Sequence, residues 1–437
     1  MKKLTLIIWL TLVSGFAFSQ WIQLNPELTN PQYQLNSVFF TDVNTGYAVG
    51  RYRLEDYGTK GFIIKTIDGG AKWDTLWWDK TTENSSSLTS VFFTNAITGY
   101  AVGGYHIGEE WNLFGIVLKT NDGGLNWDTF SFNGWGLNSV YFTDAKTGYV
   151  VGSNENDGKG IILKTIDGGI TWTQLSSDIT QSLYSIFFID INTGYAIGWN
   201  GTIIKTINGG ATWESLSSGI AYTLHSVFFI NSNTGYVVSW GSNERSANVD
   251  FYWPNLQIFM KTEDGGATWS SNINQGYPLR SVFFTDSITG YAVGDGGIIK
   301  TTDGGLNWIS QTSVTSNSLL SVYFTDSNTG YAVGNNGTIL KTTNGGGFPT
   351  FVENVSQEST FTVYPNPATN KINIETHGNL LGETTICIFN MNGAILQLEK
   401  FQSQTLIEMD VSAMVKGIYL LQIQTKAGVE TEKLVVQ

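Results

Sequence analysis

The chain has 437 residues, and its 50 Gly, 15 Trp, 19 Tyr and 25 Phe against only seven Pro are typical of an all-β protein rich in tight turns. Its formal net charge at pH 7 is −13, and it contains no long run of basic residues. An acidic chain of this kind is not expected to bind nucleic acid or an anionic membrane surface.

Residues 1–19 are predicted to be a secretory signal peptide. Two lysines precede an apolar run over 4–13, and Ala17 and Ser19 place small side chains three positions and one position before Gln20. The apolar run is short for a bilayer span, and no other stretch is long enough to cross a membrane. We expect cleavage before Gln20 and no transmembrane segment afterwards.

Two sequence units alternate seven times over residues 20–350. The first reads SVFFTDVNTGYAVG at 37–50, and the second reads KTIDGGAKW at 65–73. A period of roughly forty to fifty-five residues predicts a repeat architecture. Later copies of the first unit begin at Ser90, Ser139, Ser185, Ser226, Ser281 and Ser321.

Each repeat is predicted to form four short antiparallel strands, because β-branched and aromatic runs are bounded by turn residues. In the first repeat these strands span 37–42, 46–50, 61–66 and 72–76. Asp42 is expected to accept backbone N–H bonds in the first turn, and Gly46 is expected to supply a positive φ. Seven such repeats predict an all-β, seven-bladed β-propeller.

The seventh repeat lacks a fourth strand that begins with Trp, since it ends in KTTNGGGFP. The mature N-terminus reads QWIQLNP at 20–26 and matches TWTQLSS at 171–177 of the third repeat. We therefore predict that an N-terminal strand led by Trp21 completes the seventh blade. Such closure removes the exposed strand edges that an open array would leave.

The pattern T-x-D-G-G-x-x-W resembles the Asp-box of bacterial neuraminidase-type repeats. The resemblance implies a hairpin turn in which the Asp caps its own backbone. Asn208 and Asn344 replace the Asp in two copies, and Asn can cap a turn but cannot act as a base. A structural role is therefore predicted for the acidic copies, and no Ca²⁺ site is expected because each turn has one carboxylate. These copies are Asp68, Asp122, Asp167, Asp264 and Asp303.

Together, the two units resemble the photosystem II assembly and stability factor family, whose members are seven-bladed propellers. The resemblance covers about residues 20–351 and implies the fold. The photosynthetic role does not carry over, because those proteins use a basic patch to engage a thylakoid partner. This chain is acidic and has four Arg, which are Arg51, Arg53, Arg245 and Arg280.

Residues 361–437, after a polar linker at 351–360, are predicted to form a small β-sandwich. They resemble the type IX secretion C-terminal sorting domain of Bacteroidetes through YPNP at 364–367, KGIY at 416–419 and KLVV at 433–436. The resemblance implies the type IX secretion machinery as a partner. It also implies export across the outer membrane, followed by release or attachment at the cell surface. A generic adhesive sandwich is the alternative.

No metal or other cofactor is expected. The single cysteine, Cys387, excludes an intramolecular disulfide and a Cys-based metal cluster. His106, His225 and His377 lie far apart in the sequence and have no metal-ligand spacing.

The loops between the second and third strands vary most among the repeats. They are expected to share one face with the connections between blades, and loops on a rigid scaffold often carry binding. Their aromatic side chains suit stacking on sugars or anchoring a protein, or they pack their own loops. The candidates here are Arg51, Arg53, Tyr105, His106, Trp111, Trp240 and Trp253.

The residue before each first-strand Ser varies as well, and these residues are expected to ring the mouth of the central channel. Tyr184, His225 and Arg280 fall on three consecutive blades. They are expected either to form a polar pocket or to fill the channel mouth as solvated side chains.

The favoured function is a secreted or cell-surface, non-catalytic binding or scaffold propeller with an unknown protein or glycan ligand. A purely structural surface protein is a variant of this hypothesis. The alternative is a glycan-active hydrolase. The resemblance to Asp-box propellers suggests this alternative, because they include sialidases and xyloglucanases. A sialidase needs three Arg that converge on a carboxylate and a Tyr nucleophile with a Glu partner. A xyloglucanase joins two propellers around a cleft with two acids, whereas this chain predicts one propeller. The acids considered are Asp56, Glu109, Glu110 and Asp250.

Overall fold

The computed structural model describes residues 21–24, 30–55, 58–79, 85–107, 112–175, 179–240, 256–347, 361–376, 383–389, 395–402, 404–425 and 428–437. The described residues up to Gly347 belong to one compact unit, and those from Phe361 onward belong to a second. The predicted signal peptide and linker lie outside the described residues. Within the described part of the chain, no helix has the length and apolar character that a bilayer crossing requires.

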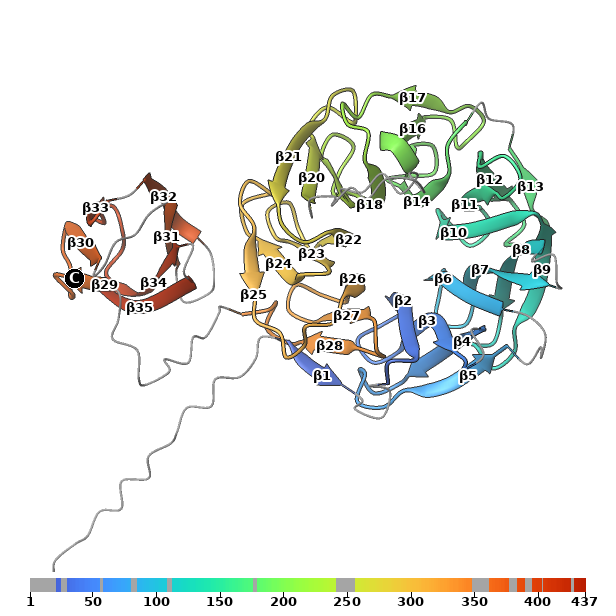
Figure 1. The fold of residues 1–437 in the computed structure, drawn as a ribbon, viewed down its shortest axis with the longest axis horizontal. Helices are drawn as coiled ribbons and strands as arrows, with labels where there is room; N and C mark the ends of the chain where they lie inside the picture. The colour runs from blue at the N-terminus through green and yellow to red at the C-terminus, as the bar shows by residue number, and fades with distance from the viewer. Residues whose placement is uncertain are drawn as a thin grey trace, which may run out of the picture. The chain divides into compact units, whose positions relative to one another are not determined.

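The first unit is a ring of seven four-stranded antiparallel sheets (Figure 1), in which the first strand of each sheet faces the centre. Blade 1 holds β2 (Tyr33–Phe40), β3 (Gly46–Arg53), β4 (Thr59–Thr66) and β5 (Asp74–Trp78). Blade 2 holds β6 (Ser85–Phe93), β7 (Gly99–Ile107), β8 (Asn112–Thr120) and β9 (Asp128–Asn133). Blade 3 holds β10 (Trp135–Phe142), β11 (Gly148–Asn154), β12 (Gly160–Thr165) and β13 (Thr173–Gln174).

The other blades repeat this order. Blade 4 holds β14 (Leu183–Phe188), β15 (Gly194–Gly198), the short 3₁₀ turn η2 (Trp199–Gly201), β16 (Ile203–Thr206) and β17 (Glu214–Leu216). Blade 5 holds β18 (Thr223–Phe229), β19 (Gly235–Trp240), β20 (Leu256–Thr262) and β21 (Ser270–Gln275). Blade 6 holds β22 (Leu279–Phe284), β23 (Gly290–Gly294), β24 (Gly297–Thr301) and β25 (Ile309–Gln311). Blade 7 holds β26 (Leu319–Phe324), β27 (Gly330–Gly334), β28 (Ile339–Thr342) and β1 (Ile22–Leu24).

The N-terminal strand β1 is the fourth strand of blade 7, as predicted, because it pairs antiparallel with β28. Trp21 is fully buried, and its ring meets Phe324 edge-on at 5.8 Å and 89°. Trp73 meets Phe40 in the same way within blade 1, at 6.0 Å and 88°. Trp21 therefore occupies the place that the Asp-box Trp occupies in the other blades.

Each first-strand Ser joins its blade to the next one. The Ser37 hydroxyl accepts a hydrogen bond from the Val91 backbone N–H at 3.3 Å, and Ser321 accepts one from Val38 at 3.3 Å. The second of these bonds links blade 7 to blade 1. The same bond is made by Ser90, Ser139, Ser185, Ser226 and Ser281.

The KTIDGGAKW unit also joins neighbouring blades. The Tyr47 hydroxyl and the Lys65 ammonium both donate to the Gly123 carbonyl of the next blade, at 3.0 and 2.9 Å. Tyr331 and Lys341 of blade 7 donate in the same way to the Gly69 carbonyl of blade 1. The Lys of the repeat therefore holds adjacent blades together.

The Asp of this unit holds its own turn. The Asp68 carboxylate accepts hydrogen bonds from the Thr66 hydroxyl at 2.8 Å and from the Lys72 backbone N–H at 2.9 Å. Gly69 and Gly70 have φ values of 65° and 89°, a region that glycine enters without steric cost. This geometry leaves the carboxylate with the turn-capping role that the Asp-box resemblance implies.

The role predicted for Gly46 was wrong. Gly46 does not have a positive φ, and a Cβ built at this position would meet the Phe40 ring at 2.5 Å. Glycine is needed there because the Phe40 ring lies against its backbone. Asp42 does cap this turn, since its carboxylate accepts from the backbone N–H groups of Asn44 and Thr45 at 2.8 and 2.9 Å.

The second unit contains two packed antiparallel sheets around one hydrophobic core. The three-stranded sheet has the order β29-β30-β33, and the four-stranded sheet has the order β32-β31-β34-β35. The bounds are β29 (Phe361–Tyr364), β30 (Lys371–Thr376), β31 (Glu383–Phe389), β32 (Ile395–Gln402), β33 (Leu406–Asp410), β34 (Gly417–Thr425) and β35 (Gly428–Val436).

Candidate functional site

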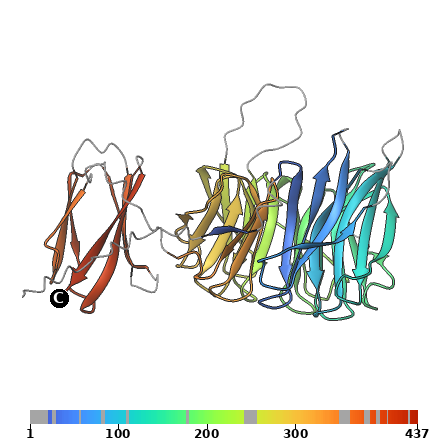
Figure 2. The same cartoon turned by 90° about the horizontal axis from the view of Figure 1, so that it is seen from below.

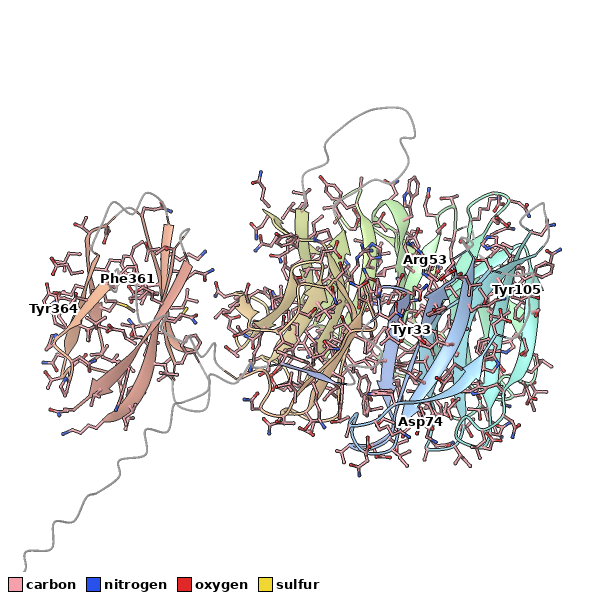
Figure 3. The ribbon with its side chains drawn as sticks, turned by 60° about the horizontal axis from the view of Figure 1, so that its bottom comes forward. Tyr33, Arg53, Asp74, Tyr105, Phe361 and Tyr364 are labelled. Carbon is pink, nitrogen blue, oxygen red and sulfur yellow. The ribbon has the colours of Figure 1, made fainter. Side chains whose placement is uncertain are left out.

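The propeller has two unlike faces, and its strands run between them (Figure 2). The TDVNTG and DGG turns share one face, since Gly69 N–H donates to the Asn44 carbonyl at 2.8 Å. We call this the turn face. The loops between second and third strands and the connections between blades share the other face, which we call the loop face. Arg53 and Tyr105 lie toward the loop face and Asp74 toward the turn face (Figure 3).

The residue before each first-strand Ser is a β-bulge, at which the register between first and second strands shifts. In blades 1 to 3 this residue clamps the next blade. Asn36, Thr89 and Asn138 donate to the carbonyls of Leu88, Leu137 and Leu183 at 2.7, 2.9 and 2.7 Å. In blades 4 to 6 the bulge residues are Tyr184, His225 and Arg280, whose side chains are longer.

Tyr184, His225 and Arg280 line a single cavity of about 490 Å³, which we call the Tyr184 cavity. The rings of Tyr184 and His225 stack at 5.7 Å and 30°. Four blades contribute to its wall. The remaining lining residues are Asp157, Gly158, Thr180, Gln181, Ser182, Trp199 and Thr223.

The described charges of this cavity have partners of opposite sign. The Arg280 guanidinium Nε lies 3.7 Å from Asp295 Oδ1, and Asp157 lies 3.1 Å from the Lys159 ammonium. Burial, and then the positive charge of Arg280, lowers the pKa of His225 to about 3. The imidazole is therefore neutral at pH 7 and offers one donor and one acceptor nitrogen.

Trp199 also lines the cavity, although the sequence analysis did not select it. Backbone hydrogen bonds hold its WNG turn, since the Trp199 N–H donates to the Ser182 carbonyl at 2.9 Å and the Gly201 N–H donates to the Tyr222 carbonyl at 2.8 Å. Comparison of the repeats could have indicated Trp199, because the corresponding residue of the short loop in blade 7 is an Asn, Asn335. This loop is one of the short ones, so its length does not mark it as a binding loop.

A second cavity of about 360 Å³ lies between blades 1 and 7, and we call it the Arg51 cavity. It is lined by Arg51 and Arg53, together with Tyr33, Gln34, Asn317, Asn335, Asn336 and four neighbouring residues. The Arg51 Nε donates to the Gln34 amide oxygen at 3.0 Å. Burial, and then the nearby Arg53, lowers the pKa of Arg51. Like charges gathered in this way suit an anionic or strongly polar group.

Tyr105 and His106 lie on β7 and line neither of these two cavities. Tyr105 stacks on Phe114 of its own blade at 5.3 Å and 9°, so its ring packs within that blade. Trp240 ends β19. The candidates Trp111 and Trp253 lie outside the described residues, as do the acids Asp56, Glu109, Glu110 and Asp250.

The Asp-box carboxylates are poor candidates for acid–base catalysis. The backbone N–H of Asn126 and then its side-chain amide lower the pKa of Asp122 to about 2, and Thr268 lowers that of Asp264 to about 2. Both groups are ionised and engaged within their own turns at neutral pH. Among the described residues, no three His, Cys, Asp or Glu side chains are grouped as a metal site would require.

The motif residues of the second unit meet in space. The Asn366 side chain donates to the Lys433 carbonyl at 2.6 Å, and its amide oxygen accepts from the Val435 N–H at 2.9 Å. The YPNP and KLVV motifs, far apart in the sequence, are therefore joined at one edge of the sandwich.

Residues 362–437 match the model of the secretion system C-terminal sorting domain family, which indicates export by type IX secretion. The fold and this match define a class, a seven-bladed propeller that precedes a sorting domain. The propeller is similar to the solved structure of YCF48 bound to D1 peptide, with 17% identity, a TM-score of 0.53, and coverage of 75% of this chain and 98% of that chain.

YCF48 from Cyanidioschyzon merolae is similar at 18% identity, with a TM-score of 0.51 and coverage of 74% and 98%. At this identity the similarity shows the fold alone, and it confirms the fold expected from the photosystem II factor resemblance. The search of curated protein sequences found no match to this chain.

Proposed function

We propose that this chain is an exported, non-catalytic binding propeller whose loop face captures a protein or glycan ligand at the outer cell surface or in the medium. The observation that carries the proposal is the contrast between the two faces. On the turn face, the Asp-box carboxylates accept hydrogen bonds within their own turns, as Asp68 does. The loop face instead holds two cavities lined by polar side chains.

The arrangement of Arg residues supports binding over sialidase chemistry. Arg51 and Arg53 line one cavity and Arg280 lines the other, so these three do not converge on one carboxylate. A protein ligand is also compatible with the fold, because the YCF48 structure described above contains a bound peptide. The match to the sorting-domain family supports a location outside the cell, because such a domain is a partner of the type IX secretion machinery.

The test uses residues 20–437, the chain without its predicted signal peptide. This protein is presented to a glycan panel and a peptide array, and both binding and the release of reducing sugar ends are measured. We expect binding without release. Binding should fall when a loop-face residue is changed, as in Arg53→Ala, and should stay the same in a turn-face control, Lys72→Ala. Release of sugar would overturn the non-catalytic assignment, and no binding on either panel would overturn the binding role.

A further inference from the structure

We infer that the Tyr184 cavity binds one neutral sugar unit of a glycan, with Trp199 and Tyr184 as the aromatic surfaces against its ring. The inference rests on the proposed function, because it names the ligand class for one of the two loop-face cavities. The cavity volume of about 490 Å³ lies within the range of small-ligand pockets.

The cavity coincides with a change in the repeat at its bulge position. In blades 1 to 3 a short Asn or Thr at the bulge bonds to the next blade. Tyr184, His225 and Arg280 stand at the same position in three consecutive blades and line the hollow. One hollow lined from blades 3 to 6 suits a compact ligand unit. Peptide recognition, by contrast, commonly uses a sheet edge or an elongated groove.

The electrostatics favour a neutral ligand. Arg280 faces Asp295 and Asp157 faces Lys159, so each described charge at the cavity already has a counter-charge. An anionic ligand would compete with Asp295 for Arg280. The wall also contains the uncharged polar residues Thr180, Gln181, Ser182 and Thr223. The Ser182 hydroxyl donates to the Gly158 carbonyl at 3.2 Å, and its oxygen can still accept a hydrogen bond.

The aromatic side chains supply the other half of the recognition. A pyranose has an apolar face of C–H groups and a rim of hydroxyls, and it packs its apolar face on an aromatic ring. The Tyr184 ring stacks on His225, and the backbone of Trp199 is held by the hydrogen bonds of its turn. Side chains fixed before the ligand arrives lose little conformational entropy when it binds.

The chain provides its own matched substitutions. Asn335 occupies the Trp199 position in blade 7, and both turns make the same bonds. The backbone N–H groups donate to Ser182 and Ser318 at 2.9 Å, and Asn200 and Asn336 have φ of 55° and 56°. Trp199→Asn should therefore keep the turn and remove the ring. Tyr184→Asn should likewise give blade 4 the clamp that Asn138 makes in blade 3.

The experiment measures binding of small sugars to residues 20–437, the chain without its predicted signal peptide, by ligand-observed NMR. The neutral probes are methyl β-glucoside, methyl β-galactoside, methyl α-mannoside and N-acetylglucosamine, and the acidic probes are glucuronate and N-acetylneuraminate. We expect at least one neutral sugar to bind, with affinity lowered tenfold or more in Trp199→Asn and in Tyr184→Asn. Lys72→Ala, on the turn face, should leave this binding unchanged.

Three outcomes would overturn the inference while leaving the proposed function in place. The first is that the chain prefers the acidic sugars to the neutral ones. The second is that Arg53→Ala removes ligand binding and Trp199→Asn does not. The third is that Trp199→Asn removes the binding of a peptide. The denaturation midpoint of each variant is measured to check its fold. We expect normal midpoints, because Trp199→Asn and Tyr184→Asn copy residues that already occur at the same positions in other blades. Normal midpoints together with no binding of any neutral sugar would also overturn it.

Discussion

At the scale of single residues, hydrogen bonding decides which side chains remain available for chemistry. Asp167 accepts from the Thr165 hydroxyl at 2.7 Å and from the Thr171 backbone N–H at 3.0 Å, and Asn208 of blade 4 accepts equivalent bonds. Because the Asn208 amide oxygen accepts the same bonds as the Asp167 carboxylate, the role of the carboxylate in this turn is structural. The bulge positions differ, because there the residue type changes what the site can bind.

The Asp-box prediction compares two substitutions at Asp167. Asp167→Asn should keep the denaturation midpoint close to wild type at pH 7, because blade 4 already folds with Asn208 and a Thr four residues later. Asp167→Ala should lower the midpoint, because the turn loses its acceptor. Urea denaturation checks both, and equal midpoints for the Asn and Ala variants would contradict the capping role.

His225 predicts a pH dependence of stability. Its folded-state pKa of about 3 lies below the ordinary value of 6.5, so between these values the unfolded chain takes up a proton that the folded chain does not. The contribution of His225 to the free energy of unfolding therefore decreases as the pH falls from 6.5 toward 3. His225→Asn should lose less stability than wild type between pH 7.5 and pH 4.5, measured by urea denaturation. An equal loss in both proteins would refute this assignment.

At the scale of elements, each blade is joined to the next by two repeated sets of bonds. First-strand Ser hydroxyls accept from the following blade near the centre of the ring. Second-strand Tyr hydroxyls donate to the Asp-box carbonyl of the following blade at the turn face. Both sets continue from blade 7 to blade 1. The strand β1 completes blade 7 by pairing with β28, although it comes from the other end of the repeat region.

Removing the Trp21 side chain tests the importance of β1. This ring is fully buried against Phe324 and Tyr291. Trp21→Ala should lower the free energy of unfolding by about 3–5 kcal/mol, as for other large aromatic truncations in cores. Ile22→Ala, at a side chain that is 47% exposed on the same strand, should change it by less than about 0.5 kcal/mol.

Tryptophan fluorescence measures this transition in the propeller, because no Trp follows Trp308 in the sequence. Similar losses of stability in Trp21→Ala and Ile22→Ala would show that the two side chains contribute equally. That result would contradict the role of Trp21 as the core residue of the seventh blade.

At the scale of the whole molecule, the two units are proposed to have different functions, which are binding and export. The propeller presents the loop face, and the sandwich carries the sorting-domain match. The sandwich has its own hydrophobic core, so its fold does not depend on residues of the propeller core. We therefore expect export and binding to be separable by mutation.

Deleting residues 361–437 should leave the propeller inside the cell envelope of a bacterium that has type IX secretion, because the predicted signal peptide would still direct it across the inner membrane. Asn366→Ala should reduce export as well, since Asn366 joins the YPNP and KLVV motifs. Cell fractionation and immunoblotting measure this, with Trp199→Asn as a control that should be exported normally. Unchanged export of the truncated chain would refute the sorting role.

The sequence by itself determined the number of blades, the strands within them, the strand that completes blade 7 and the nature of the C-terminal module. These features follow from local turn chemistry, from apolar patterning and from comparison of one repeat with another, all of which are written along the chain. The turn-capping role of the Asp-box followed for the same reason, because Asn208 and Asn344 stand in equivalent copies.

Only the tertiary structure decided which variable residues meet. It placed Trp199 with Tyr184, His225 and Arg280 in one cavity, and Arg51 with Arg53 in another. It also showed that Gly46 is needed for the Phe40 ring and not for its φ. Contacts of this kind depend on the rotation from one blade to the next and on the depth of the channel, and no local pattern encodes either quantity.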